Sequence, residues 1–399
     1  MNKAIKSAHL NGTRDRSYPV VRFGAENAKK IHAYHREFPG YAETPLVQLN
    51  ELADRLGLNR IFIKDESKRF GLNAFKGLGG SYSIGRYIAE KLGIPIEEAT
   101  YDYITSGPVR EKLGDLTFVT ATDGNHGRGI AWTAGILGYK SVVYMPKGSS
   151  IERLENIRAH GATADITDLN YDDTVRLAGA TAEENGWVFV QDTSWPDYEK
   201  IPGWIMEGYT TMGHEITGQL GGERPTHLLL QAGVGAMAGA MTAYFKDYYG
   251  DDAPIVIIVE PDQADCIYRT ARADDGSIHA VKGSLSTIMA GLACGEPCTI
   301  GWDVLHAHAD HFLSVPDGIA AKGMRILGNP LPGDPAVISG ESGAVTLGVA
   351  AELMQNESLL PLRKALNLDE NAKILCISTE GDTDKAYYRK IVWDGLCPQ

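Results

Sequence analysis

THLLLQAGVGAMAGAMTAYFKDYY, residues 226–249, combines an apolar run, a glycine-rich turn and a long segment with helical spacing. The run THLLLQ predicts a buried strand, and the segment that starts at Ala236 predicts a helix. The turn between them contains Gly233, Gly235 and Gly239, and small residues let backbone N–H groups close around an anion at the positive end of a helix. We therefore expect a phosphate site here; the alternative is a tight turn that only packs a strand against a helix.

The same strand–turn–helix pattern recurs along the chain. From about residue 60, short β-branched runs alternate with longer helical stretches, which is typical of an α/β fold with a mainly parallel sheet. With 399 residues, the chain is long enough for two domains. Ligands of such folds bind at the carboxyl ends of the strands. The other predicted strands are residues 60–66, 116–122, 141–146, 162–168, 187–192, 254–261 and 372–379.

Composition and charge exclude several classes of protein. Hydrophobic residues make up 43% of the chain and charged residues 22%, which fits a globular protein with a sizeable core. Acidic residues outnumber basic ones by 51 to 38, and the resulting net charge of −13 disfavours nucleic acid as a partner. We expect no membrane span and no secretory signal, because no apolar run is long enough for the first and the N-terminal residues lack the apolar segment of the second. Five cysteines without a CxxC pair indicate a reducing, cytoplasmic location.

A second polar turn follows the predicted strand at 116–122. It reads ATDGNHGRG, residues 121–129, and precedes a helical stretch. Backbone amides and polar side chains at a helix N-terminus suit a carboxylate ligand. Asp123 or Asn125 could instead be a plain helix cap, but Asp, Asn and His in one turn exceed what capping requires.

A third loop, NAFKGLGGS at residues 73–81, contains a lysine between an aromatic residue and several glycines. Most lysines are solvated, but Lys76 follows Phe75 directly and precedes a helical stretch. A lysine held against an aromatic ring in a desolvated site can have a lowered pKa and form a Schiff base.

Two further patterns suggest other functions. The turn after residue 231 is close to GxGxxG, and Glu260 ends the next strand where a ribose-binding acid would fall, so an NAD-dependent oxidoreductase is a competing interpretation. Against it, the glycines are spaced GxGxxxG and lie past the middle of the chain. The residues HAHADH at 306–311 match the HxHxDH metal motif of metallo-β-lactamase-like hydrolases, but no histidine follows His311. We therefore expect no metal site and interpret this segment as the end of a helix that leads into a strand.

The ordered set of motifs resembles the fold type II pyridoxal-phosphate enzymes, the group of threonine dehydratase and the tryptophan synthase β subunit. The resemblance runs from about residue 44 to residue 378. It implies pyridoxal 5'-phosphate as the cofactor and two interleaved three-layer domains with parallel sheets. The large domain would comprise residues 1–85 and 194–399, and the small domain residues 86–193. The motifs in family order are TPL at 44–46, the Lys76 loop, the Asn125 turn, the phosphate loop, IVIIVEP at 255–261 and ESGA at 341–344.

Within this group, the chain is similar to the ammonia-lyases that act on 2,3-diaminopropionate. Asp123 stands where the dehydratases usually have serine, and the segments STIMAGLACGEP and ISTEGDTD fit the same branch. The resemblance implies a carbon–nitrogen lyase, a homodimer, that converts D- or L-diaminopropionate to pyruvate and two ammonia molecules. The alternatives are a serine/threonine dehydratase, the NAD-dependent oxidoreductase and a catalytically silent amino-acid-binding protein.

The resemblance also assigns roles in substrate binding and catalysis. Lys76 would form the Schiff base with the cofactor and act as a base at Cα. Asp123 would be a second base on the opposite face or, alternatively, an anchor for the substrate amine. Asp192 would recognise the β-amine, with a structural cap as the alternative. Further contacts to the substrate would come from Thr122, Gly124 and His126.

The same resemblance implies which residues hold the cofactor. Phe75 would pack beside the ring, and Asn125 would hydrogen-bond the ring hydroxyl. Ser378 would contact the pyridine nitrogen, although the neighbouring Thr379 competes for that role. The amides for the phosphate would come from Gly233, Val234, Gly235, Ala236 and Met237.

Overall fold

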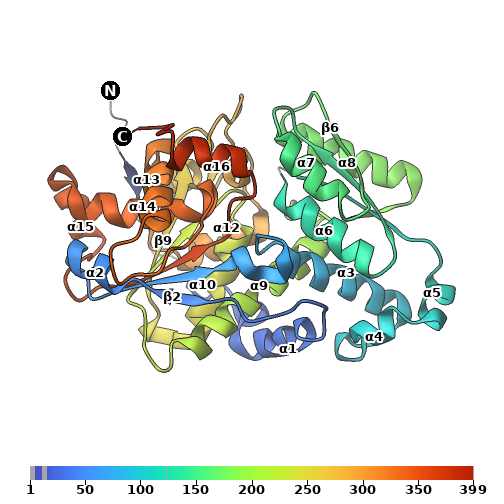
Figure 1. Ribbon diagram of the computed structural model, residues 1–399. Coiled ribbons are helices and arrows are strands. Elements are labelled where there is room, and N and C mark those ends of the chain that lie inside the picture. Colours follow the sequence, from blue (N-terminus) through green and yellow to red (C-terminus); the bar gives the residue numbers. More distant parts are fainter. Residues whose placement is uncertain (1–4, 11–15, 123, 399) are drawn as a thin grey trace.

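The strands of the computed structural model, which describes residues 5–10, 16–122 and 124–398, form two sheets (Figure 1). The larger sheet contains β1 (Lys6–Ala8), β2 (Leu46–Gln48), β3 (Arg60–Asp65), β8 (His227–Gln231), β9 (Ile255–Pro261), β10 (His311–Val315) and β11 (Lys373–Ser378), in the order β1-β10-β9-β8-β11-β3-β2. The smaller sheet contains β4 (Thr117–Ala121), β5 (Lys140–Met145), β6 (Thr163–Ile166) and β7 (Val188–Phe189), in the order β6-β5-β4-β7.

Both sheets are mainly parallel, as the sequence predicts. Every pairing in the smaller sheet is parallel, and so are the pairings between β10, β9, β8, β11 and β3. All eight predicted strands are present, with ends that differ by a few residues. The strands β1 and β2 were not predicted; each has three residues and adds to an edge of the larger sheet in the antiparallel direction.

Helices connect the strands and cover the sheets. They are α1 (Ala25–His35), α2 (Asn50–Leu56), α3 (Gly77–Leu92), α4 (Tyr101–Ile104), α5 (Gly107–Leu113), α6 (Asn125–Ile136), α7 (Ile151–Arg158), α8 (Tyr171–Asn185), α9 (Lys200–Gln219), α10 (Ala236–Tyr249), α11 (Cys266–Ala273), α12 (Thr299–His308), α13 (Asp317–Gly328), α14 (Glu341–Gln355), α15 (Leu360–Ala365) and α16 (Lys385–Val392). The short 3-10 helix η2 (Glu66–Gly71) leads from β3 toward Lys76. The helical stretches predicted to follow the loops at 73–81 and 121–129 are α3 and α6, which begin earlier than expected, inside those loops. The helix predicted from Ala236 is α10.

The larger sheet has an apolar layer on each face. Leu228 and Leu230 of β8 pack in the cluster that includes α9 and α10, whereas Leu229 packs in the cluster that includes α13 and α14. This alternation follows from the two-residue period of a strand, and it explains why β8 is apolar at almost every position. The sheet is therefore the middle of three layers.

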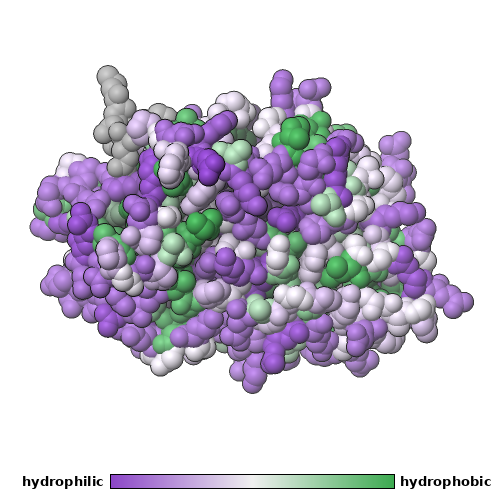
Figure 2. All heavy atoms as spheres, viewed as in Figure 1, coloured by the Kyte–Doolittle hydropathy of each residue, from purple (hydrophilic) through white to green (hydrophobic). Residues whose placement is uncertain are grey.

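The smaller sheet and its helices α6, α7 and α8 gather at one end of the molecule, opposite α13–α16 (Figure 1). The face drawn in Figure 2 is mostly hydrophilic, with small scattered hydrophobic patches. None of the helices in the described ranges has the length and apolarity needed to cross a membrane. The predicted domain boundary at 85/86 lies inside the continuous helix α3, and the division into domains stays a prediction.

Candidate active site

A cavity lies where the carboxyl ends of β8, β11 and β4 approach the Lys76 loop. Its wall includes Lys76, Asn125 and residues 231–238, so all three loops singled out in the sequence contribute to it. The order β8-β11-β3 in the larger sheet explains part of this convergence, because the loops after neighbouring parallel strands meet at one edge. The cavity is also lined by Phe75, Tyr171, Asp192, Gly291, Leu292, Cys294, Ser342, Thr379 and Glu380.

Lys76 lies at the N-terminal end of α3 with its ammonium group inside the cavity. Its Nζ donates a hydrogen bond to Asp192 Oδ2, and the two groups form an ion pair. Nζ also lies 5.4 Å from the centre of the Phe75 ring and 6.0 Å from that of Tyr209. The backbone N–H of Phe75 donates to the carbonyl of Thr379 at 3.1 Å, which ties the lysine loop to the end of β11.

Asp192 is a buried anion. Burial by itself would raise the pKa of its carboxyl, but the neighbouring His126 and Lys76 lower it by more, to about 2. Its Oδ1 accepts hydrogen bonds from Gln191 Nε2 at 3.2 Å and from Tyr171 Oη at 3.5 Å. Asp192 is therefore held in place by neutral donors on one oxygen and bound to a cation through the other.

The loop at the start of α10 has the geometry of an anion site. Gly235 has a φ of +91°, and a Cβ at this position would lie 2.8 Å from Ile267 Cδ1, so the turn requires glycine. The first N–H groups of a helix lack acceptors within the helix and point at the space before it. Gln231 Oε1, at the end of β8, is buried without a hydrogen-bond partner in the same wall. The loop is suited to a phosphate, and Lys76 and Asn125 in the same wall supply an amine and an amide suited to the ring of pyridoxal phosphate.

Several residues predicted to bind the substrate or cofactor do not line this cavity. Thr122 Oγ1 accepts a hydrogen bond from the backbone N–H of Gly124 at 2.9 Å and so shapes the turn before α6. His126 is buried behind Asp192, with Nε2 2.9 Å from the carbonyl oxygen of Val190; burial lowers the pKa of its imidazole. Asp123 lies outside the described residues, and its two proposed roles stay predictions.

Ser378, which is predicted to contact the pyridine nitrogen, also does not line the cavity. Its hydroxyl donates to Ser339 Oγ at 2.8 Å, whereas the neighbouring Thr379 is part of the cavity wall. Neighbouring residues at the end of a strand point to opposite faces, so only one of the two can face the ring. Thr379 is therefore the one of the two that lines the cavity, and the contact to the pyridine nitrogen stays a prediction.

The sequence argument did not single out Tyr171 and Glu380, although both line the cavity. Glu380 accepts a hydrogen bond from Asn125 Nδ2 and another from the backbone N–H of Ser342. A polar residue directly after a buried parallel strand is a signal that could have found Glu380. No comparable signal marks Tyr171, which starts α8 far from the three loops in sequence.

The two competing patterns have structural explanations. Glu260 is buried and accepts hydrogen bonds from the backbone N–H groups of Ile267 and Tyr268 at 2.9 and 2.5 Å, so it caps α11 and is not open to a ribose. The HxHxDH segment is the end of α12 followed by β10, as expected from the sequence. In the described part of the chain, no group of three or more His, Cys, Asp and Glu residues is arranged to hold a metal ion.

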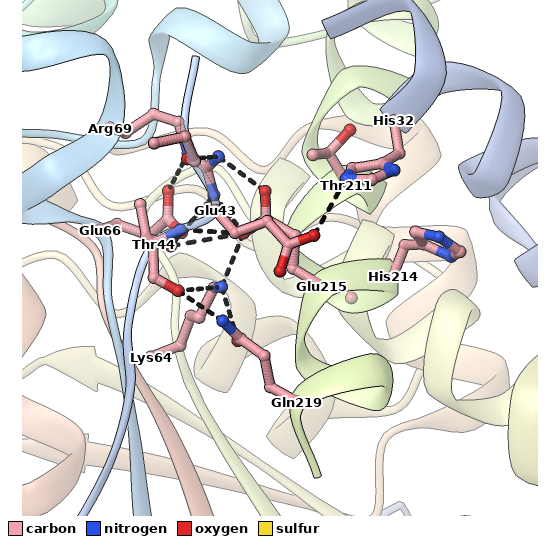
Figure 3. A network of polar contacts seen from close by, with 12 residues as sticks. His32, Glu43, Thr44, Lys64, Glu66, Arg69, Thr211, His214, Glu215 and Gln219 are labelled. Atoms are coloured by element: carbon pink, nitrogen blue, oxygen red, sulfur yellow. Dashed lines mark hydrogen bonds and ion pairs between the residues drawn. The ribbon is translucent and has the colours of Figure 1, made fainter. Parts of the chain in front are cut away.

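A buried ionic network braces the elements that carry Lys76 (Figure 3). Glu215 of α9 binds Lys64 Nζ at 2.6 Å and Arg69 Nη2 at 2.7 Å, and Arg69 also binds Glu66 at 2.8 Å. All four side chains are fully buried, and two cations balance two carboxylates. Burial by itself would raise the pKa of Glu215, but the neighbouring Arg69 and Lys64 lower it by more, so that it falls to about 2. The network fixes β3 and η2 against α9, and the lysine loop follows directly after η2.

Comparison with known proteins assigns this fold and site to a class. Residues 37–379 match the family described as pyridoxal-phosphate dependent enzyme. Threonine deaminase isoform 2 of Solanum lycopersicum has the same fold, with a TM-score of 0.73 at 18% identity over 99% of this chain and 98% of the other. The chain is a pyridoxal-phosphate-dependent enzyme of fold type II.

More similar relatives narrow the class. The chain is 54% identical over 370 residues to the diaminopropionate ammonia-lyase of Salmonella typhimurium, which covers 92% of each protein. It is 50% identical over 375 residues to the enzyme of the same name from Escherichia coli K12, covering 94% of this chain and 93% of the relative. The crystal structure of the E. coli holoenzyme matches with a TM-score of 0.91 and 47% identity, over 100% of this chain and 99% of the other. The chain belongs to the diaminopropionate ammonia-lyase family.

Proposed function

We propose that this chain eliminates the β-amino group of 2,3-diaminopropionate, as the D or the L isomer, and that hydrolysis of the released aminoacrylate by water then gives pyruvate and a second molecule of ammonia. The observation that carries the proposal is the ion pair between Lys76 and Asp192 in the wall that also contains the phosphate loop. It joins a lysine suited to Schiff-base chemistry to a carboxylate suited to a cationic leaving group. The identity of 54% to a diaminopropionate ammonia-lyase supports the same substrate.

The first task of the site is removal of the proton from Cα. Bound pyridoxal phosphate supplies an electron sink that makes this proton acidic. Lys76 Nζ lies inside the cavity beside the rings of Phe75 and Tyr209, where its amine can take the proton from one face of the substrate. Asp123 is our proposed base for the other face, which would allow both enantiomers to react.

The second task is departure of the β-amine, which leaves as ammonia only when it is protonated. Asp192 stays anionic because its pKa is lowered to about 2, so it favours a cation beside it. Here that cation is the ammonium group of Lys76. When Lys76 is joined to the cofactor or acts at Cα, Asp192 can pair with the β-ammonium group of the substrate instead. This exchange of partners anchors the leaving group in its protonated form.

A serine or threonine dehydratase is the second candidate. Its leaving group is a hydroxyl, which needs no buried carboxylate to keep it positively charged. The E. coli relative was also solved in complex with D-serine, so a hydroxyl-bearing ligand can occupy such a site in that protein. The anionic state of Asp192 favours the diamino substrate for this chain.

The proposal is tested by measuring pyruvate release from D- and L-diaminopropionate, L-serine and L-threonine. We expect turnover of both diaminopropionate isomers to exceed that of the hydroxy amino acids. Borohydride reduction of the wild-type enzyme should attach the cofactor covalently to the peptide that contains Lys76, and Lys76→Ala should lose the visible absorption band. Higher turnover of serine or threonine would assign the chain to the dehydratases, and bound NAD without a visible band would assign it to the oxidoreductases.

The proposed second base has its own test. Asp123→Asn keeps the size of the side chain but removes its basicity and its charge. Loss of a positioned base costs about 10²–10⁴-fold in rate, so turnover of D-diaminopropionate should collapse while the L isomer, served by Lys76, loses much less. Similar losses for both isomers would show that Asp123 anchors the amine.

We also propose a cytoplasmic homodimer. The five cysteines contain no CxxC pair, and all of them are thiols in the structure, which fits a reducing compartment. Sedimentation equilibrium at micromolar concentration should give twice the mass of the 43.2 kDa chain.

A further inference from the structure

Glu380 is a buried carboxylate in the wall of the cavity, at the end of β11. Its side chain is about 1% exposed. Oε2 accepts a hydrogen bond from Asn125 Nδ2, and Oε1 accepts one from the backbone N–H of Ser342 at 3.2 Å. Among the residues that the structure describes, no lysine, arginine or histidine forms an ion pair with Glu380. Both oxygens are therefore held by neutral donors.

No neighbouring cation among the described residues pairs with Glu380 to balance its charge. The neighbouring Glu341 is also buried, and burial together with Glu380 raises the pKa of Glu341 to about 7. The nearby cation, Arg153, approaches Glu341 Oε2 at 3.6 Å. A buried carboxylate without a cationic partner is costly, so its hydrogen bonds to Asn125 and Ser342 must offset the cost of its burial.

The carboxylate determines which way the amide of Asn125 faces. A carboxylate only accepts hydrogen bonds, so the amide must turn its nitrogen, and not its oxygen, toward Glu380. An amide nitrogen carries two N–H groups, and Glu380 uses one of them. The second N–H remains available to the cavity, which Asn125 also lines.

The backbone of Glu380 is fixed by its own contacts, so its side chain can hold Asn125 in one orientation. Its carbonyl accepts a hydrogen bond from the backbone N–H of Gly340 at 2.9 Å. Glu380 also forms an antiparallel bridge with Ala74, two residues before Lys76. Asn125, in contrast, belongs to α6 beside the smaller sheet, so the Asn125–Glu380 contact joins the two halves of the site.

We propose that Glu380 is a positioning residue for the cofactor: it orients Asn125 so that an amide N–H points at the ring hydroxyl oxygen of pyridoxal phosphate. This inference rests on the proposed role of Asn125 in the cofactor site. It assigns to Glu380 no contact with the reacting atoms. Its effect is on the affinity and the spectrum of the bound ring, through one hydrogen bond.

The test compares two cofactors that differ only in the ring hydroxyl. Apoenzyme is titrated with pyridoxal phosphate and with 3-deoxypyridoxal 5'-phosphate, and binding is followed by protein fluorescence; the E. coli relative has been solved in apo form. Glu380→Gln keeps the shape of the side chain but no longer dictates the orientation of the Asn125 amide. We expect it to weaken binding of pyridoxal phosphate roughly tenfold and to leave the deoxy analogue within about twofold.

Asn125→Ala and a control variant complete the test. Asn125→Ala should give the same selective loss, and the double variant should bind pyridoxal phosphate no more weakly than Asn125→Ala alone. The control is Asp382→Asn, in the same loop, where the carboxylate accepts from Asn73 Nδ2 at 3.1 Å and does not contact Asn125. It should leave the ratio of the two affinities unchanged. Glu380→Gln should also shift the visible absorption maximum of bound pyridoxal phosphate.

Equal weakening of both cofactors by Glu380→Gln, or additive losses in the double variant, would overturn the inference. If Asn125→Ala fails to discriminate between the cofactors, the proposed role of Asn125 fails and the inference fails with it. The cofactor lysine is tested separately by Lys76→Ala, so that outcome leaves the lyase proposal standing. If Glu380→Gln does not fold, Glu380→Asp withdraws the carboxylate by one methylene, and it should show a smaller loss for pyridoxal phosphate only.

Discussion

Replacement of Asp192 by asparagine separates the electrostatic role of this carboxylate from its shape. Asp192→Asn keeps an oxygen that can accept from Gln191 and Tyr171, the two donors on Oδ1. It removes the negative charge that now binds Lys76. The variant therefore leaves the cavity similar in size but without the negative charge at residue 192.

The size of the effect follows from the pKa of Asp192. Its surroundings lower this pKa from 3.8 to about 2, which corresponds to about 2.5 kcal/mol of extra stabilisation of the anion. His126 and Lys76 both contribute to this stabilisation, so if the β-ammonium group of the substrate takes over the place of Lys76, losing the charge should lower kcat/KM for diaminopropionate by roughly 10- to 100-fold. Serine has no cationic leaving group, so its kcat/KM should fall by less than about threefold.

The assay is pyruvate release at pH 8 with both isomers of diaminopropionate and with serine, for the wild type and the variant. Asp172→Asn is the matched control, because Asp172 lies next to Tyr171 at the start of α8 but does not line the cavity. It should change both activities by less than about twofold. Equal losses of diaminopropionate and serine turnover in Asp192→Asn would refute the assignment of Asp192 to the leaving group.

Three further changes have expected outcomes. Arg69→Met leaves two buried carboxylates with one cation and should lower the free energy of unfolding in urea by about 3–5 kcal/mol, whereas Lys140→Met, which breaks the exposed pair with Asp115, should cost less than about 1 kcal/mol. Similar costs would contradict the importance of the buried network. Gly235→Ala should weaken binding of pyridoxal phosphate at least tenfold, because the new Cβ collides with Ile267, while Gly250→Ala at the other end of α10 meets no atom within 4 Å and should cost stability without changing cofactor affinity. The pKa of Glu341 is raised from 4.5 to about 7 in the folded protein, so its protonated form stabilises the fold fully at pH values below 4.5. This contribution is lost as the pH rises through about 7. The free energy of unfolding in urea is measured for Glu341→Gln and the wild type, and the variant's value minus the wild-type value should rise by up to about 3 kcal/mol from pH 4.5 to pH 8. A difference that stays constant would show that Glu341 does not titrate in this range.

The fold could be predicted from the sequence wherever burial leaves a continuous apolar run. The parallel strands are covered on both faces, so nearly every residue in β8 and β9 is buried and the runs stand out. The edge strand β1, Lys6–Ala8, contains no such run. It is a strand because it pairs with β10, more than 300 residues away, and a single sequence carries no local sign of that pairing.

The site could be predicted loop by loop but not as an arrangement. Each loop can be recognised in the sequence because small and polar residues directly follow a predicted strand. Lys76 lies after β3 of the larger sheet, whereas Asp192 lies after β7 of the smaller sheet. Their ion pair therefore depends on how the two sheets are packed together. Ser378 and Thr379 show a finer limit: a shift of one residue at the end of a strand exchanges the side chain that faces the cavity for the one that faces away.

Among the residues that the structure describes, the cavity is lined by two carboxylates, Asp192 and Glu380, and the kind of group that holds each one separates their roles. Asp192 is bound through one oxygen to a cation, and a cationic partner can be exchanged for another when Lys76 moves into the reaction. Glu380 is bound through both oxygens to N–H groups of Asn125 and Ser342, one of which is backbone, so exchange would leave a buried anion unsatisfied. Asp192 is therefore suited to a ligand that arrives and departs, as a leaving ammonium group does. Glu380 is suited to a contact that stays fixed through the whole catalytic cycle, such as its hydrogen bond to Asn125, which orients the amide toward the cofactor ring.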